Sequence, residues 1–239
     1  LQDPVLLRVV LLSAGFSQKA LSHLKEDERT EIASETLRDL GEAQGDFVSD
    51  ILYRYLLTLG DSLGGSMRNV VGASAQRAFT VMVLESLQSA GVNPRIEKGE
   101  ENGKIQGIAW SDRKMLFDRT PKFVKKNVDV ILLRTDPPVE GSPDQIEDKD
   151  RYLAAGELKG GIDPAGADEH WKTAKTALDR VRKAFRSGRA PCLFFAGVAI
   201  EREMARELYR DVKKGNLSFA ANLTSEEQTH ALISWLIAL

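Results

Sequence analysis

The sequence predicts a mixed α/β fold with a helical N-terminal domain, and three observations support this. Apolar residues recur at helical spacing through about the first 90 residues. Short apolar runs bounded by glycine, proline or charge follow them, a pattern typical of buried strands. Long helical patterns then alternate with those runs up to the C-terminus. We therefore predict a helical domain over residues 1–91 and an α/β domain over residues 92–239.

The front part is predicted to fold as three helices that end near glycines, over residues 5–14, 17–41 and 46–60. Residues 60–69 form a polar segment, expected to be a flexible connection to a further helix over residues 73–90. Its glycine amides, hydroxyls and Arg68 suit phosphate oxygens, and a plain loop between helices explains them equally well. The segment lacks the Gly-Lys-Ser/Thr ending of a nucleotide-binding loop, which excludes an NTPase of that type.

The back part is predicted to combine strands and helices. Apolar runs predict strands over residues 105–110, 128–134, 154–159 and 192–200. Helical patterns predict helices over residues 167–187, 201–213 and 224–237. Residues 136–150 are rich in proline, glycine and acids, so we expect a surface loop there. This arrangement favours one sheet with helices packed on it.

The composition excludes several classes of protein. The 239 residues are 42% hydrophobic and 28% charged, enough for a packed core. The net charge of −2 excludes a histone-like polycation but not a nucleic-acid enzyme, because binding depends on where the charge lies. Cys192 is the single cysteine, so an internal disulfide and a Cys-based zinc site are excluded. We expect a bacterial cytoplasmic protein with no membrane contact, whose natural chain begins upstream of Leu1.

Charge is distributed unevenly along the chain. Residues 1–61 carry 6 basic and 11 acidic side chains, whereas residues 62–134 carry 12 and 7, and residues 159–189 carry 8 and 4. The two positive stretches are candidates for lining a DNA channel. Solvated helix faces explain such runs equally well.

An acid interrupts a predicted strand at two places. Asp129 lies in the first of these strands, and Glu157 follows 28 residues later, ahead of Leu158 and Lys159. A carboxylate near a buried strand needs a metal ion, a basic partner or access to water. Side chains alternate along a strand, so Glu157 and Lys159 share a face. If the two strands are neighbours, we expect all three charged groups to converge.

Such a set of groups suits hydrolysis of a phosphodiester bond. Two carboxylates can hold Mg²⁺, and an ammonium such as Lys159 can stabilise developing charge. The pattern of an Asp and then Glu-x-Lys on the next strand resembles the PD-(D/E)xK nuclease superfamily. A structural ion pair at a strand end is the alternative interpretation. A second Glu-x-Lys triplet, residues 147–149, falls in the predicted loop and is expected to be solvated surface.

An unusual passage links the second strand to the next helix. Gly160 and Gly161 directly follow Lys159 and allow a close approach of backbone to a ligand. His170 then lies near the start of the predicted helix and, with an ordinary pKa near 6.5, can accept a proton from water. A histidine that caps or packs the helix start is the alternative.

Residues 156–170, GELKGGIDPAGADEH, resemble the catalytic segment of the BsoBI/AvaI family of type II restriction endonucleases. The strand with Asp129 lies at the matching distance upstream. The resemblance implies a restriction-endonuclease-like mixed sheet core flanked by helices. It also implies a Mg²⁺-dependent homodimer that binds double-stranded DNA, recognises the degenerate palindrome CYCGRG and leaves 5′ overhangs.

The resemblance also implies roles for individual residues. Asp129 and Glu157 are expected to bind the metal ion, with the carbonyl of Leu158 as a further ligand. Lys159 corresponds to the catalytic lysine, and His170 to a general base. By this resemblance Asp163 is expected to contact a base. Arg68, Ser66 and Lys172 are further candidates for DNA contact, apart from the resemblance. An acid at residue 163 suits base contact, because it can accept from the exocyclic amine of cytosine.

Two other functions are compatible with the same fold. A structure-selective repair or recombination nuclease of this superfamily would also need Asp129, Glu157 and Lys159. A DNA-binding protein that keeps the fold without cleaving would not need them, so the intact set argues against it.

Overall fold

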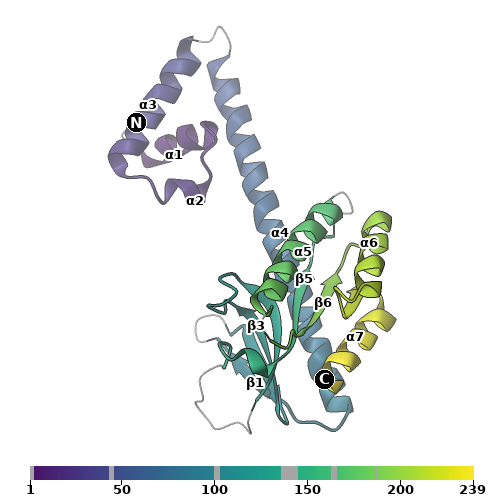
Figure 1. The fold of residues 1–239 in the computed structure, drawn as a ribbon. Coiled ribbons are helices and arrows are strands. Elements are labelled where there is room, and N and C mark those ends of the chain that lie inside the picture. Colours follow the sequence, from purple (N-terminus) through teal and green to yellow (C-terminus); the bar gives the residue numbers. More distant parts are fainter. Residues whose placement is uncertain (1–2, 43–45, 100–102, 136–144, 163–165, 187) are drawn as a thin grey trace. The chain divides into compact units, whose positions relative to one another are not determined.

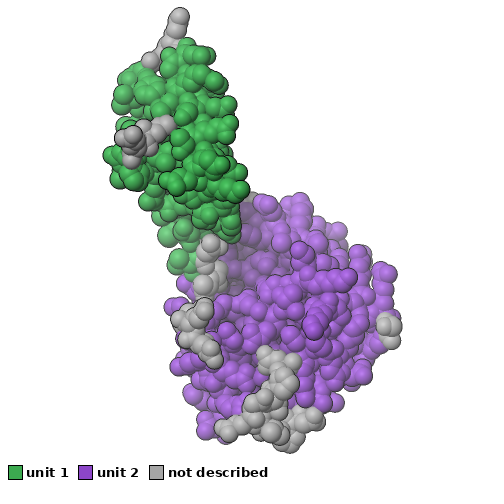
Figure 2. Space-filling view, turned by 90° about the vertical axis from the view of Figure 1, so that its left-hand side faces the viewer, with its two compact units in different colours: residues 1–70 green, residues 71–239 purple. Residues whose placement is uncertain are grey.

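The structure, a computed structural model, describes residues 3–42, 46–99, 103–135, 145–162, 166–186 and 188–239. The chain divides into two units, Leu1–Val70 and Val71–Leu239 (Figure 2). The prediction drew its boundary after residue 91, at the end of a helix, whereas the two units part within a helix. None of the described helices is long and apolar enough to cross a membrane.

The first unit begins with α1 (Pro4–Ser13), α2 (Gln18–Leu21) and α3 (Glu26–Glu42). Their small core contains Val10, Leu11 and Ala33. The prediction of one helix over residues 17–41 is wrong. The Ser17 hydroxyl accepts from the Ala20 amide to start α2, and the Glu28 carboxylate accepts from the Lys25 amide to start α3. Each hydrogen bond satisfies a backbone amide at a helix N-terminus, so two separate helices begin within this segment.

Helix α4 (Phe47–Ser89) runs without interruption for 43 residues. The flexible connection predicted over residues 60–69 is therefore wrong: this segment is helical. Glycine costs about 1 kcal/mol relative to alanine inside a helix, so the glycines of this segment weaken the helix but do not end it. Ser66 fits the helix by donating its hydroxyl to the carbonyl of Ser62, at 3.0 Å.

The second unit is built on a seven-stranded mixed sheet whose strands follow one another in chain order (Figure 1). The strands are β1 (Arg95–Lys98), β2 (Ile105–Trp110), β3 (Arg113–Arg119), β4 (Val128–Arg134), β5 (Tyr152–Lys159), β6 (Cys192–Gly197) and β7 (Phe219–Asn222). The first five strands pair antiparallel, whereas β6 and β7 are parallel to β5. Strands β2 and β4 have the predicted bounds.

Helices cover both faces of this sheet. One face packs against α5 (Ala167–Ala184) and α6 (Arg202–Lys213), which contribute residues such as Trp171 and Leu208. The other face packs against the end of α4 and against α7 (Glu226–Ala238), with residues such as Phe79 and Leu232. Neighbouring residues of β4 point to opposite cores. This architecture confirms the predicted mixed sheet flanked by helices.

Candidate active site

Strands β4 and β5 place the two acids side by side. The pairing of Val130 with Gly156 puts Asp129 opposite Glu157 when the register is continued by one residue. Lys159 lies two residues beyond Glu157 and therefore on the same face of the sheet. The three groups meet because two adjacent antiparallel strands each carry a charge near the same end.

Lys159 bridges the two carboxylates. Its Nζ lies 2.9 Å from Oε2 of Glu157 and 3.3 Å from Oδ2 of Asp129. These two oxygens are consequently no more than about 6 Å apart, a separation that one ion with ligand distances of about 2 Å can close with a small movement. The structure thus brings Asp129, Glu157 and Lys159 together.

Backbone and side-chain donors orient Asp129. The Leu158 amide donates to Oδ2 of Asp129 at 2.9 Å, and the Asn127 side-chain amide lies 3.4 Å from Oδ1. The N–H and C=O of one strand residue point to the same edge, so the Leu158 carbonyl also faces β4. Asn127 was not among the predicted site residues, and its signal in the sequence is only its position two residues before Asp129.

Burial controls the protonation of this cluster. Glu157 is 4% exposed, and its burial, together with the charge of Asp129, raises the pKa of its carboxyl to about 7. Burial acts to lower the pKa of Lys159, but the charges of Glu157 and Asp129 outweigh it and raise that pKa. Two carboxylates facing one ammonium leave an excess of negative charge in a nearly buried place.

The donor set fits a hard divalent cation. Mg²⁺ prefers oxygen ligands, keeps several waters and needs only one or two protein carboxylates, which Asp129 and Glu157 supply. Within the part of the chain that the structure describes, no group of three or more His, Cys, Asp or Glu side chains is placed to hold a metal.

His170 lies against the backbone just beyond Lys159. It belongs to the first turn of α5 and is half-buried. A Cβ added to Gly161 would lie 2.4 Å from its Nε2. The imidazole therefore occupies the space that a side chain at residue 161 would need, which is a physical reason for glycine there.

The structure describes the side chains of two of the four predicted DNA-contacting residues. Lys172 is exposed on α5 and pairs with Asp168 at 2.5 Å. Ser66 belongs to the first unit, on α4. Asp163 and the side chain of Arg68 lie outside the described residues.

The second Glu-x-Lys triplet lies mostly at the surface, as predicted, with Glu147 and Asp148 exposed and Lys149 half-buried. Lys149 donates to the Ala184 carbonyl at 2.5 Å, and its Nζ lies over the rings of Phe123 and Phe185. Glu147 accepts from the Lys122 amide. The triplet thus anchors the start of β5 and contributes no carboxylate–lysine cluster of its own.

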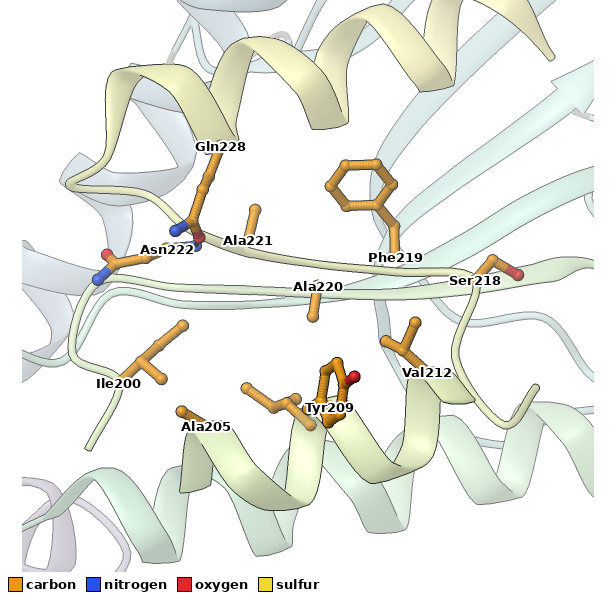
Figure 3. Close-up of a pocket in the computed structure, with 11 residues that line it drawn as sticks. Ile200, Ala205, Tyr209, Val212, Ser218, Phe219, Ala220, Ala221, Asn222 and Gln228 are labelled. Carbon is orange, nitrogen blue, oxygen red and sulfur yellow. Dashed lines mark hydrogen bonds between the residues drawn. The ribbon is translucent and has the colours of Figure 1, made fainter. Parts of the chain in front are cut away.

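A hollow of about 570 Å³ lies over the edge strand β7, between α6 and α7 (Figure 3). Its lining is mostly apolar, with Ile200, Tyr209 and Phe219, and Gln228 lies at one end. None of the three charged groups on β4 and β5 lines it. The predicted catalytic residues Asp129, Glu157 and Lys159 lie apart from it, at the end of β4 and β5.

Comparison with known proteins identifies the family. The family model "Restriction endonuclease BsobI" matches residues 5–239. The chain belongs to the BsoBI restriction endonuclease family. It is 38% identical to the type II restriction enzyme BsoBI of Geobacillus stearothermophilus, over 95% of this chain and 77% of that enzyme. It is also 38% identical to the type II restriction enzyme AvaI of Nostoc sp., over 98% of this chain and 80% of that enzyme.

Membership of the BsoBI family confirms the resemblance predicted from residues 156–170, and it confirms that the chain is a restriction endonuclease. The match extends through the helical first unit as well as the sheet. Two contacts could not be predicted from the sequence. The His170 imidazole packs against Gly161, and the Leu158 amide donates a hydrogen bond to Asp129.

Proposed function

We propose that this chain is a Mg²⁺-dependent type II restriction endonuclease that cuts both strands of double-stranded DNA at the palindrome CYCGRG and leaves 5′ overhangs. The observation that carries the proposal is the shared contact of Asp129 and Glu157 with the Lys159 ammonium. The sequence CYCGRG and the overhang are what the resemblance of residues 156–170 to this family implies. The predicted location, the bacterial cytoplasm, suits this substrate.

Asp129, Glu157 and the Leu158 carbonyl are the proposed ligands of Mg²⁺. When bound, the ion lowers the pKa of a coordinated water and screens the charge of the scissile phosphate. Glu157 must be ionised to serve as a ligand, and the Lys159 ammonium favours that form. Lys159 also lies where it can stabilise the negative charge that develops on the phosphate oxygens.

His170 is the proposed general base. Its half-buried imidazole rests against Gly161, two residues beyond Lys159, so it is held close to the end of β5. A neutral imidazole can take the proton of the attacking water as the water oxygen approaches phosphorus. The leaving 3′ oxygen departs on the opposite side.

Recognition is assigned to residues outside this cluster. Asp163 is proposed to accept from the exocyclic amine of a cytosine. Arg68, Ser66 and Lys172 are proposed to contact the DNA, and phosphate contacts of this kind make affinity dependent on salt. A homodimer would present one cleavage centre to each strand of a palindromic site.

Digestion of a plasmid with Mg²⁺, followed by sequencing of the product ends, tests the function. We expect cleavage at CYCGRG sites only, with uniform 5′ extensions. Scattered ends at nicks or junctions would favour the repair or recombination nuclease instead. DNA binding without strand scission would favour the non-cleaving protein.

A further inference from the structure

Helix α4 carries an exposed apolar stripe in the first unit. Its members are Val48, Leu52, Leu56, Leu63, Met67 and Val70, all between 54% and 70% exposed. At 100° per residue these six side chains fall within an arc of about 100°. The charged residues Asp50, Arg54 and Asp61 lie on the opposite side of the helix. An amphipathic helix with its apolar side in water is expected to have a binding partner.

We propose that this stripe binds a second copy of the chain, with the two α4 helices antiparallel about a two-fold axis near Leu59. The inference deepens the homodimer of the proposed function and rests on it. It names the surface that joins the two copies.

The order of residues in the stripe is self-complementary. When two such helices run antiparallel about a point near Leu59, Val48 lies opposite Val70, Leu52 opposite Met67, and Leu56 opposite Leu63. A two-fold interface requires this property, because the same surface serves on both copies. Gly60 lies beside the axis, and a Cβ added there would meet no atom of its own chain within 4 Å.

The size and charge of the stripe also suit a second copy. Val48 to Val70 spans about 33 Å of helix. Six side chains of this size, each more than half exposed, leave roughly 600 Å² in water, close to the roughly 800 Å² per partner of a standard interface once its rim is included. The stripe itself is uncharged, so two copies meet without like-charge repulsion.

Sedimentation of the full chain tests the stripe. We expect wild type to sediment at twice the chain mass and Leu56→Glu/Leu63→Glu to sediment as a monomer, with self-association weakened about 100-fold or more. Leu57→Glu is the matched control, because Leu57 is adjacent and equally exposed but faces away from the stripe. Circular dichroism should give all three proteins the same helix content. A stripe variant that stays dimeric, or a monomeric wild type, would overturn the proposal.

Cross-linking tests the antiparallel order independently of charge. In a Cys192→Ala background, Leu56→Cys and Leu63→Cys chains are oxidised separately and after mixing. The antiparallel pairing predicts disulfide-linked dimers only in the mixture. Links within each separate sample would mean a parallel pairing and would contradict the proposed axis.

Cleavage assays separate this inference from the proposed function. A wild type that dimerises but does not cut would refute the nuclease, while the mass measurements would still report on the stripe. A wild type that cuts at CYCGRG while the stripe variant remains dimeric would refute only the interface. Loss of double-strand cutting in the monomeric variant, with Leu57→Glu unaffected, supports both.

Discussion

Burial is unusual in two regions of the molecule, in opposite senses. An acid is buried at the end of β4 and β5, and an apolar stripe is exposed on α4. The first buries a carboxylate, Glu157, which is 4% exposed, and the second leaves leucines such as Leu52 more than half exposed. Buried acids and exposed apolar stripes both cost free energy unless a partner compensates them. Two acids share the single ammonium of Lys159, whereas the leucines of the stripe face water. The two departures thus point to two different partners of the same enzyme.

The largest expected effect is on the acids. Glu157→Gln should lower cleavage by about 1,000-fold or more, because it removes a charged metal ligand and a charge that Lys159 neutralises. DNA binding should persist, since less negative charge faces the phosphate backbone. Glu226→Gln changes an exposed carboxylate on α7 and serves as the control. Cleavage near the wild-type rate in Glu157→Gln would show that the buried acid needs no cation.

The two halves of α4 differ in burial, and the free energy of unfolding should reflect this difference. Phe79 is buried under the sheet at 1% exposure, whereas Leu57 is 56% exposed. Phe79→Ala should lower the free energy of unfolding by about 3–5 kcal/mol, because it leaves a cavity in the core. Leu57→Ala should change it by less than about 0.5 kcal/mol. Urea unfolding of both variants gives the two values, and equal losses would contradict the burial difference along α4.

A change at Gly161, against which His170 packs, should lower the cleavage rate by a smaller factor. Gly161→Ala places a methyl group where Nε2 of His170 lies, 2.4 Å from the new Cβ, so the imidazole must move. Cleavage should slow by about 10- to 100-fold through loss of base catalysis, with little change in DNA binding. Gly188→Ala is the control, because a Cβ there meets no atom within 4 Å. An unchanged rate in Gly161→Ala would reduce His170 to a packing residue.

The sequence predicts the parts of this molecule whose signal is local. The apolar runs of β2 and β4 have no charge at their centres, and their bounds follow directly from the pattern. Strand β3 was missed, because Arg113, Lys114 and Arg119 frame a core of only three apolar residues. In the structure Lys114 is paired with Glu97 of β1, a contact that depends on sheet register.

The candidate site was predictable in composition but not in geometry. Asp129, Glu157 and Lys159 stand out as charges beside apolar strands, whereas their distances depend on the pairing of β4 with β5. Residues 60–69 mislead for a related reason. Glycine and serine weaken a helix locally, but the segment lies inside one uninterrupted helix of 43 residues, and residues far along the chain decide that.

The pH dependence of stability is the smallest expected effect. The pKa of Glu157 is about 7 in the folded, metal-free protein and 4.5 for an ordinary glutamate. The unfolded chain therefore loses its proton first, and folding stability falls as pH rises from about 4.5 to 7. Glu157→Gln removes this dependence, so its melting temperature relative to wild type should be higher at pH 8 than at pH 5.

Mg²⁺ should reverse that trend in wild type. The ion binds the ionised carboxylates and competes with the proton on Glu157, so it should raise the melting temperature more at pH 8 than at pH 5. The Glu157→Gln variant should show little of this stabilisation at either pH. Equal stabilisation of both proteins by Mg²⁺ would mean that the ion binds elsewhere, and the buried acid would then need another explanation.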